Sequence, residues 1–305
     1  MGRLQRMYSE SGIYFVTARA FQSRFLLTPS PAVNRALGGV LAMAVKLTGV
    51  KLHGYVVASN HIHLLVTSQG ASLSRFMQYF LGNAARKLGR LTGWSGSLWQ
   101  RRFSAEPVLD DEAALGRLRY ILAHGVKEGL VKHPAQWPGL SCLKLLREGG
   151  VEWHRFFHWS RRWKKGALIK GAENAWDDRW AEEISLELAP LPGWAALSQS
   201  ERRDRVDRLV CEIVEEAAKT STQEVKGAEA VIQEDPRHRP ARSKKSPRPL
   251  CHTTSIEKRK AFVETLRAWV TAFVEASKRF RSGEWAVEFP PWSFRPSVQY
   301  DVCGT

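Results

Sequence analysis

The order of apolar and polar residues predicts alternating strands and helices over the first half of the chain. Runs rich in β-branched and aromatic residues predict strands, and apolar residues at three- and four-residue steps predict helices. The predicted elements are strands at 12–21, 52–58, 61–67 and up to 108, and helices at 31–44, 72–88 and 111–125. This order predicts an α+β fold, a ferredoxin-like sandwich with an antiparallel sheet and helices on one face.

The second half of the chain has a different character and predicts a mostly helical C-terminal extension. We expect one domain at 1–150, which holds all the candidate site residues described below, a Trp-rich helical region at 151–225, a basic disordered linker at 226–254, and a C-terminal helix and tail at 255–305. The linker prediction depends on residues 237–249, which hold six Lys and Arg residues among prolines and serines, with no acidic residue.

Charge and composition narrow the class of protein. A formal net charge of +16 attracts polyanions, so nucleic acid is the leading partner class, although a basic tail alone would give the same balance. No apolar run is long enough to span a membrane, and the first residues do not resemble a secretory signal, so we expect a cytoplasmic protein. The four cysteines are far apart and predict neither a disulfide framework nor a zinc knuckle.

The segment SNHIHLLVT, residues 59–67, holds the first candidate site. Side chains alternate along a strand, so His61 and His63 share one face while Ile62, Leu64 and Val66 face the core. Two imidazoles in this arrangement can chelate one cation. An isolated pair is nevertheless more typical of surface histidines, because metal sites usually need a third ligand.

The predicted helix at 111–125 can supply that ligand. It has one apolar stripe and one polar stripe, and Tyr120 and His124 lie one turn apart on the polar one. If this stripe faces the histidine pair, His124 completes a three-ligand site and Tyr120 lies beside the cation. A tyrosine next to a metal suits phosphodiester cleavage, because the ion polarises the phosphate and the phenolate attacks phosphorus. Periodicity alone favours Tyr120 as an ordinary helix-edge residue.

Three blocks of sequence together resemble the single-tyrosine HUH transposases, and most closely the REP-associated tyrosine transposases. The blocks are the histidine strand beginning at Asn60, GSLWQRRF at 96–103 and RYILAHGVKEGLV at 119–131, followed by WPGLS at 137–141. The resemblance spans residues 8–142. Two positions depart from the family pattern: His124-Gly125 replaces the usual Asn-Pro, and Ala58-Ser59 lacks the usual proline.

The resemblance implies cleavage and rejoining of single-stranded DNA beside hairpin-forming, REP-like repeats. It implies a 5′ phosphotyrosine on Tyr120, with Mg²⁺ or Mn²⁺ held by His61, His63 and His124, in a nucleoid-associated protein. The residue equivalent to His124 is often Gln or Asn in relatives, and an imidazole there favours softer ions. Whether the protein is a monomer or a dimer stays open.

Basic residues around these blocks are candidates for binding DNA phosphates. They are Arg75, Arg86, Arg90, Arg101, Arg102 and Arg117. Tyr79, on the basic face of the helix at 72–88, is a weaker candidate nucleophile that could instead stack on a base. The basic face of that helix could also be simply solvated.

Two other enzyme classes fit less well, and one non-enzymatic alternative stays open. Histidine-triad nucleotide hydrolases need a third histidine where this chain has Leu65, and HxHxDH hydrolases need Asp and His at Leu65 and Val66. The alternative is a catalytically silent, domesticated protein that only binds DNA hairpins.

Overall fold

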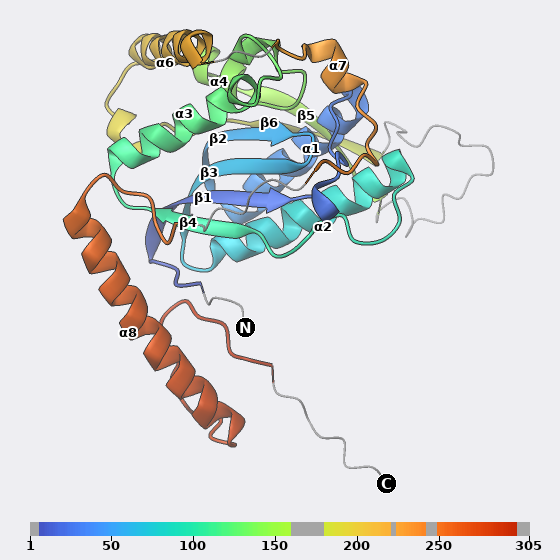
Figure 1. The fold of residues 1–305 in the computed structure, drawn as a ribbon. Coiled ribbons are helices and arrows are strands. Elements are labelled where there is room, and N and C mark those ends of the chain that lie inside the picture. The colour runs from blue at the N-terminus through green and yellow to red at the C-terminus, as the bar shows by residue number, and fades with distance from the viewer. Residues whose placement is uncertain (1–5, 160–179, 221–223, 242–248, 298–305) are drawn as a thin grey trace.

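A computed structural model gives the fold of the chain (Figure 1). The structure describes residues 6–159, 180–220, 224–241 and 249–297. Of the Trp-rich region predicted at 151–225, Trp163 and Trp176 lie outside the described residues, as do Arg242 to Arg248 of the predicted basic linker.

A four-stranded antiparallel sheet forms the centre of the molecule. Its strands are β1 (Ser11–Arg19), β2 (Lys51–Ala58), β3 (His61–Gln69) and β4 (Ser104–Val108), in the order β2-β3-β1-β4. Helix α1 (Pro31–Thr48) connects β1 to β2, and α2 (Ser72–Thr92) connects β3 to β4. This connectivity and strand order are those of a ferredoxin-like sandwich, which confirms the predicted fold class.

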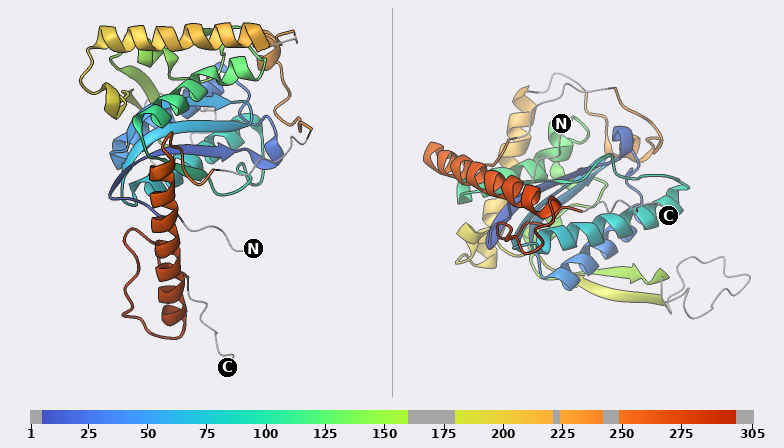
Figure 2. Two further views of the ribbon diagram at one scale, coloured as in Figure 1. Left: turned by 60° about the vertical axis from the view of Figure 1, so that its left-hand side comes forward. Right: turned by 90° about the horizontal axis from the view of Figure 1, so that it is seen from below.

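Helices lie on both faces of this sheet, whereas the sequence predicted them on one. Helices α1 and α2 pack against one face, and α3 (Asp111–Lys127) crosses the other (Figures 1 and 2). Ser30 caps α1, since its hydroxyl accepts the Val33 N–H at 3.2 Å, and the Asp110 carboxylate caps α3 by accepting the Ala113 N–H at 2.8 Å. The second helical layer is what encloses the histidine face of the sheet.

Strand β3 divides its side chains between the two faces as the alternation predicted. Ile62, Leu64 and Val66 are at most 1% exposed and belong to the core beneath α1 and α2. His61 and His63 point to the opposite face, toward α3. Burying three large aliphatic side chains in this core fixes the register of β3, because a shift by one residue would turn the histidines, in their place, toward α1 and α2.

A second sheet, which the sequence analysis did not predict, covers the outer side of α1. Strands β5 (Glu152–Phe157) and β6 (Ala181–Leu186) pair antiparallel, and both contact α1. The approach is close because Gly38 and Gly39 occupy the middle of α1. A Cβ atom at Gly39 would collide with the carbonyl oxygen of Arg155.

The remaining helices lie around this core. They are α4 (Leu143–Glu148), α6 (Gln199–Thr220), α7 (Ala228–Ile232) and α8 (Ile256–Arg281), with 3₁₀ turns at Phe21–Ser23, Pro134–Gln136 and Pro192–Trp194. Helix α6 packs on α3 and α4. Helix α7 and the residues around His252 have defined positions within the range predicted as a linker.

Helix α8 projects away from the sandwich (Figures 1 and 2). Its C-terminal half has a small core of its own, where Ala276 and Phe280 pack with Val287 and Phe289 of the returning chain. No helix among the described residues is long and apolar enough to span a bilayer.

Candidate metal and nucleophile site

The two histidines of β3 lie edge to face at the end of the strand nearest its hairpin. Their ring centroids are 4.7 Å apart, with an angle of 84° between the ring planes. Because residues two apart on a strand project from the same face, the pairing of β3 with β1 and β2 keeps both side chains on this side of the sheet. The pair therefore presents two imidazoles to one space.

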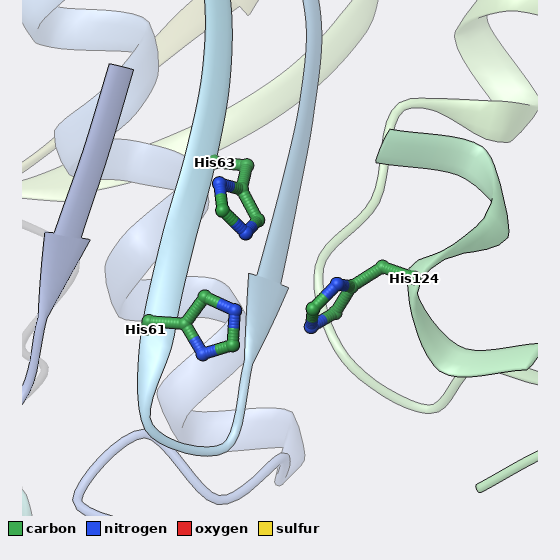
Figure 3. A group of neighbouring side chains, drawn as sticks. All are labelled: His61, His63 and His124. Carbon is green, nitrogen blue, oxygen red and sulfur yellow. The ribbon is translucent and has the colours of Figure 1, made fainter. Parts of the chain in front are cut away.

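Helix α3 brings a third imidazole to this pair. The ring of His124 lies 4.6 Å from that of His61 and 5.2 Å from that of His63, centroid to centroid. One potential ligand atom from each of the three lies within 4.8 Å of the other two. Figure 3 shows the three rings pointing into the same space, and the described part of the chain contains no other group of this kind.

Hydrogen bonds at Nδ1 orient the rings of His61 and His63. The Asn60 amide donates its N–H to the Ser23 carbonyl at 3.2 Å, so its oxygen faces His61 and accepts the Nδ1 proton at 2.5 Å. Nε2 of a neutral His61 is therefore the nitrogen that carries the lone pair. The Thr17 hydroxyl lies 2.9 Å from Nδ1 of His63, and it can accept that proton in the same way.

The burial of the site keeps its imidazoles neutral. Burial is the main cause that lowers the pKa of His61 and His63 well below the usual range, and their mutual proximity and Arg19 add to it. Burial also lowers the pKa of His124 to about 4. Nε2 of His63 and Nδ1 of His124 are buried without a hydrogen-bond partner. Neutral imidazoles with unused lone pairs form a donor set that fits a divalent cation.

Tyr120 lies beside the histidines on the same helix as His124. Its ring is 5.2 Å from that of His63 and meets Phe15 edge-on at 5.7 Å. Burial raises the pKa of the phenol above its usual value, and Glu128 and Glu106 act in the same direction, while Arg117 and Arg19 oppose them. The protein alone therefore does not favour a phenolate, so ionisation depends on further positive charge at the site.

The sequence analysis missed the contribution of β1 to this site. Phe15, Thr17 and Arg19 pair with Leu65, His63 and His61, and cross-strand partners share a face of the sheet. Phe15 stacks on His63 at 5.0 Å with 16° between the rings, and Thr17 orients the same histidine. The alternation within GIYFVTARAF would have shown that these residues share a face, but not that the face is the histidine side.

The six arginines predicted to bind DNA occupy two regions. Arg117 lies at the site, with its guanidinium carbon 5.3 Å from the Tyr120 ring centroid. Arg101 and Arg102 are exposed and follow Gln100, whose N–H donates to the Arg19 carbonyl at 2.9 Å, so they lie at the same end of the sheet.

The other three predicted arginines lie on α2, on the opposite side of the sheet. Arg75, Arg86 and Arg90 are exposed there, and Arg90 lies over the Trp159 ring at 4.2 Å. Tyr79 is on the same helix, where the nearby charges are those of Arg86 and Glu182. The structure therefore brings Tyr120, and not Tyr79, to the histidines.

The sequence that forms most of this sheet and site is similar to a known protein family. Residues 18–123 match the model of the family described as "Transposase IS200 like". The match covers His61, His63 and Tyr120, and it ends one residue before His124. Over this stretch, which is less than half of the chain, the sequence is similar to the IS200-like transposase family.

Two solved structures show similarity over part of the chain. One is a REP-associated tyrosine transposase bound to a REP hairpin, with 21% identity, a TM-score of 0.41, and coverage of 49% of this chain and 87% of that one. The other is a protein of Deinococcus radiodurans R1 assigned as a transposase, with 18% identity, a TM-score of 0.29, and coverage of 39% and 95%. No curated protein matches the sequence.

Proposed function

We propose that this protein cleaves and rejoins single-stranded DNA beside hairpin-forming repeats, through a covalent 5′ phosphotyrosine on Tyr120. The observation that carries the proposal is the convergence of three neutral imidazoles next to a tyrosine on one face of the sheet. Tyr120 and His124 are one helical turn apart, and their ring centroids are separated by 6.1 Å. A phosphate held at the histidines would therefore lie within reach of the phenol.

His61, His63 and His124 would hold the divalent cation, Mg²⁺ or Mn²⁺. Such an ion supplies Lewis-acid polarisation of a phosphate oxygen and positive charge beside the phenol. Asn60 and Thr17 engage Nδ1 of the two β3 histidines, which would leave the other nitrogen of each ring to hold the ion. The neutral state of all three imidazoles means that binding requires no prior loss of protons near pH 7.

Tyr120 carries out the covalent step in this proposal. The phenolic oxygen attacks phosphorus, so that the Oη–P bond forms while the bond from phosphorus to the 3′ oxygen breaks. The phenolic proton leaves to solvent, and the departing 3′ oxygen takes up a proton. Arg117 and Arg19 favour the phenolate, because both lower the pKa of Tyr120. The energy of the phosphodiester is retained in the phosphotyrosine and allows rejoining to a 3′ hydroxyl.

Single-stranded DNA is the substrate that the charges of the site favour. Arg101, Arg102 and Arg117 surround the histidine end of the sheet, where they can neutralise phosphates on each side of the scissile bond. The preference for hairpin-forming repeats of the REP type comes from the resemblance of the three sequence blocks. Such a substrate places the protein at the nucleoid of the cytoplasm.

The test is covalent trapping of DNA. Wild-type protein incubated with Mn²⁺ and a single-stranded hairpin oligonucleotide, taken from the DNA that flanks its gene, should give an adduct on denaturing electrophoresis. Tyr120→Phe removes one oxygen and should abolish the adduct, while hairpin affinity stays within about twofold because noncovalent binding comes mostly from basic residues. Tyr79→Phe is the matched control and should cleave at the wild-type rate.

Each alternative outcome has a clear meaning. An adduct that persists in Tyr120→Phe and disappears in Tyr79→Phe would reassign the nucleophile. Tight hairpin binding without an adduct in wild type would instead favour the catalytically silent hairpin-binding protein.

A further inference from the structure

A short segment from the C-terminal region reaches the edge of the sheet beside the candidate site. The N–H of His252 donates to the Pro107 carbonyl at 2.8 Å, and the N–H of Leu109 donates to the His252 carbonyl at 2.9 Å. His252 thus forms a parallel bridge with Val108 of β4. Through these bonds, residues 251–255, the C-terminal strap, extend a sheet built more than 140 residues earlier in the chain.

The His252 side chain lies against the aromatic ring that contacts both the histidines and the tyrosine. Its Nε2 lies 3.0 Å from the Glu106 carboxylate, and both side chains are only 12% exposed. The imidazole meets Phe15 edge-on, at 5.7 Å and 86°. Phe15 in turn stacks on His63 and meets Tyr120 edge-on. One ring therefore separates His252 from a metal ligand and from the nucleophile.

The same strap is attached to the helix that carries Tyr120 and His124. The Thr253 hydroxyl and the Thr254 N–H both donate to the Asp110 carboxylate, the latter at 3.0 Å. Asp110 also accepts the Ala113 N–H and so caps α3. The Asp110 carboxylate thus joins the strap to the first turn of α3. His252 holds β4 through its contacts with Glu106 and Val108.

We propose that His252, through its hydrogen bond to Glu106, is a positioning residue for Tyr120, and that the C-terminal strap is part of the active site. The proposal rests on the cleavage activity proposed above. Phe15 is held between His252 and the Tyr120–His63 pair, so removing the His252 ring frees one side of Phe15. Attack on phosphorus is sensitive to displacements of about 1 Å, and a loosened Phe15 removes one wall that orients the phenol.

The first measurement separates chemistry from binding. Single-turnover adduct formation with Mn²⁺ is compared for wild type, His252→Ala and His252→Gln, together with hairpin affinity. His252→Ala should lower the rate at saturating DNA about tenfold or more, with hairpin affinity within about twofold. His252→Gln retains an N–H donor for Glu106 and should recover most of the rate. Thermal unfolding shows whether each variant is folded.

The chain offers a closely matched control at His238. This histidine also comes from the C-terminal region, and it also packs on a phenylalanine, since its ring lies 5.3 Å from that of Phe25. Phe25 has no part in the candidate site. His238→Ala should therefore cleave at the wild-type rate. An equal loss of rate in the two alanine variants would overturn the proposal.

A second measurement does not depend on cleavage. Hydrogen–deuterium exchange should increase in β4 and in the first turns of α3 in His252→Ala, but not in His238→Ala, if the strap fixes these elements. A wild-type rate in His252→Ala, a loss of rate explained by lost hairpin affinity, or unchanged exchange would overturn the proposal. If wild type forms no adduct, the proposed cleavage fails, and the exchange data still decide whether the strap holds α3.

Discussion

Asn60 shows how one side chain can select the reactive form of another. Its amide nitrogen is bound to the Ser23 carbonyl, so only its oxygen can face His61, and that oxygen requires a proton on Nδ1. The opposite nitrogen of His61 is left with its lone pair directed into the group of three histidines. Without this contact His61 could equally place its proton on Nε2, where it would oppose a cation.

This role of Asn60 can be tested by a pair of substitutions. Asn60→Ala should lower Mn²⁺ affinity about tenfold, since outer hydrogen-bond partners of ligating histidines contribute at that level. Asn60→Asp also loses the bond to Ser23 but keeps an acceptor for Nδ1, so its affinity should stay within about threefold of wild type. Isothermal titration with Mn²⁺ measures both. Equal losses in the two variants would show that the hydrogen bond from Asn60 to Ser23, and not the acceptor for Nδ1 of His61, maintains the Mn²⁺ affinity.

His124 should decide which cation the site prefers. Imidazole nitrogen favours later first-row ions over Mg²⁺, and an amide oxygen reverses that tendency. We expect His124→Gln to lower the affinity for Ni²⁺ relative to Mg²⁺ at least tenfold, with Tyr120 left in place on the same helix. Competition titrations of both proteins measure the ratio, and an unchanged ratio would remove His124 from the set of ligands.

At the scale of elements, the docking of α3 assembles the site. The apolar stripe of the helix packs on β2, where Leu118 and Ile121 lie over Gly54, and the absence of a side chain at Gly54 permits the close approach. This contact determines the rotation of the helix about its axis. Tyr120 and His124, which flank the stripe, are thereby placed at the end of β3 that carries the histidine pair.

The buried position of His124 predicts an acid-sensitive fold in the metal-free protein. Its pKa is about 4 when folded and near 6.5 when unfolded, so between these values the unfolded chain binds more protons. The free energy of unfolding should therefore fall as the pH falls through this window, by about 3 kcal/mol for this group alone. His124→Gln should show a shallower fall between pH 7 and pH 5 in urea titrations with EDTA. An equally steep fall would contradict the assignment.

At the scale of the whole molecule, the net charge of +16 does not by itself say where the proposed DNA substrate would bind. Basic residues occur on both sides of the sheet, and several are already engaged in ion pairs, such as Arg147 with Asp207 and Arg119 with Glu216. The exposed Arg101 and Arg102 lie at the end of the sheet with the histidines. The position of the basic residues should therefore affect hairpin affinity more than the net charge of the protein does.

A comparison at constant net charge tests this expectation. Arg101→Gln/Arg102→Gln and Arg203→Gln/Arg208→Gln remove the same charge, the second pair from exposed positions on α6. Only Arg101→Gln/Arg102→Gln should weaken the dependence of hairpin affinity on salt. The slope of log affinity against log salt should become shallower by about 1.4 if each arginine neutralises one phosphate of a single strand. Affinity is measured by fluorescence anisotropy across a salt series. Equal slopes for the two variants would show that overall charge dominates.

Local pattern was sufficient for most of the elements of the first half of the chain. Alternation placed His61 and His63 on the face of β3 opposite Ile62, and helical periodicity placed Tyr120 and His124 one turn apart, because both periods are properties of the backbone itself. The order of these elements was also sufficient for the fold class. The pair β5 and β6 was missed because each strand has only six residues and many charged positions, so its apolar pattern is weak.

What the sequence by itself determined was therefore which side chains share a strand face or a helix stripe. Only the tertiary structure decided which of those faces meet. It placed Thr17 and Arg19 behind the histidines, separated Tyr79 from them by the thickness of the sheet, and brought His252 to Phe15 from the far end of the chain. Such contacts arise from strand pairing and from the packing of large buried surfaces over long sequence separations, and no local period records them.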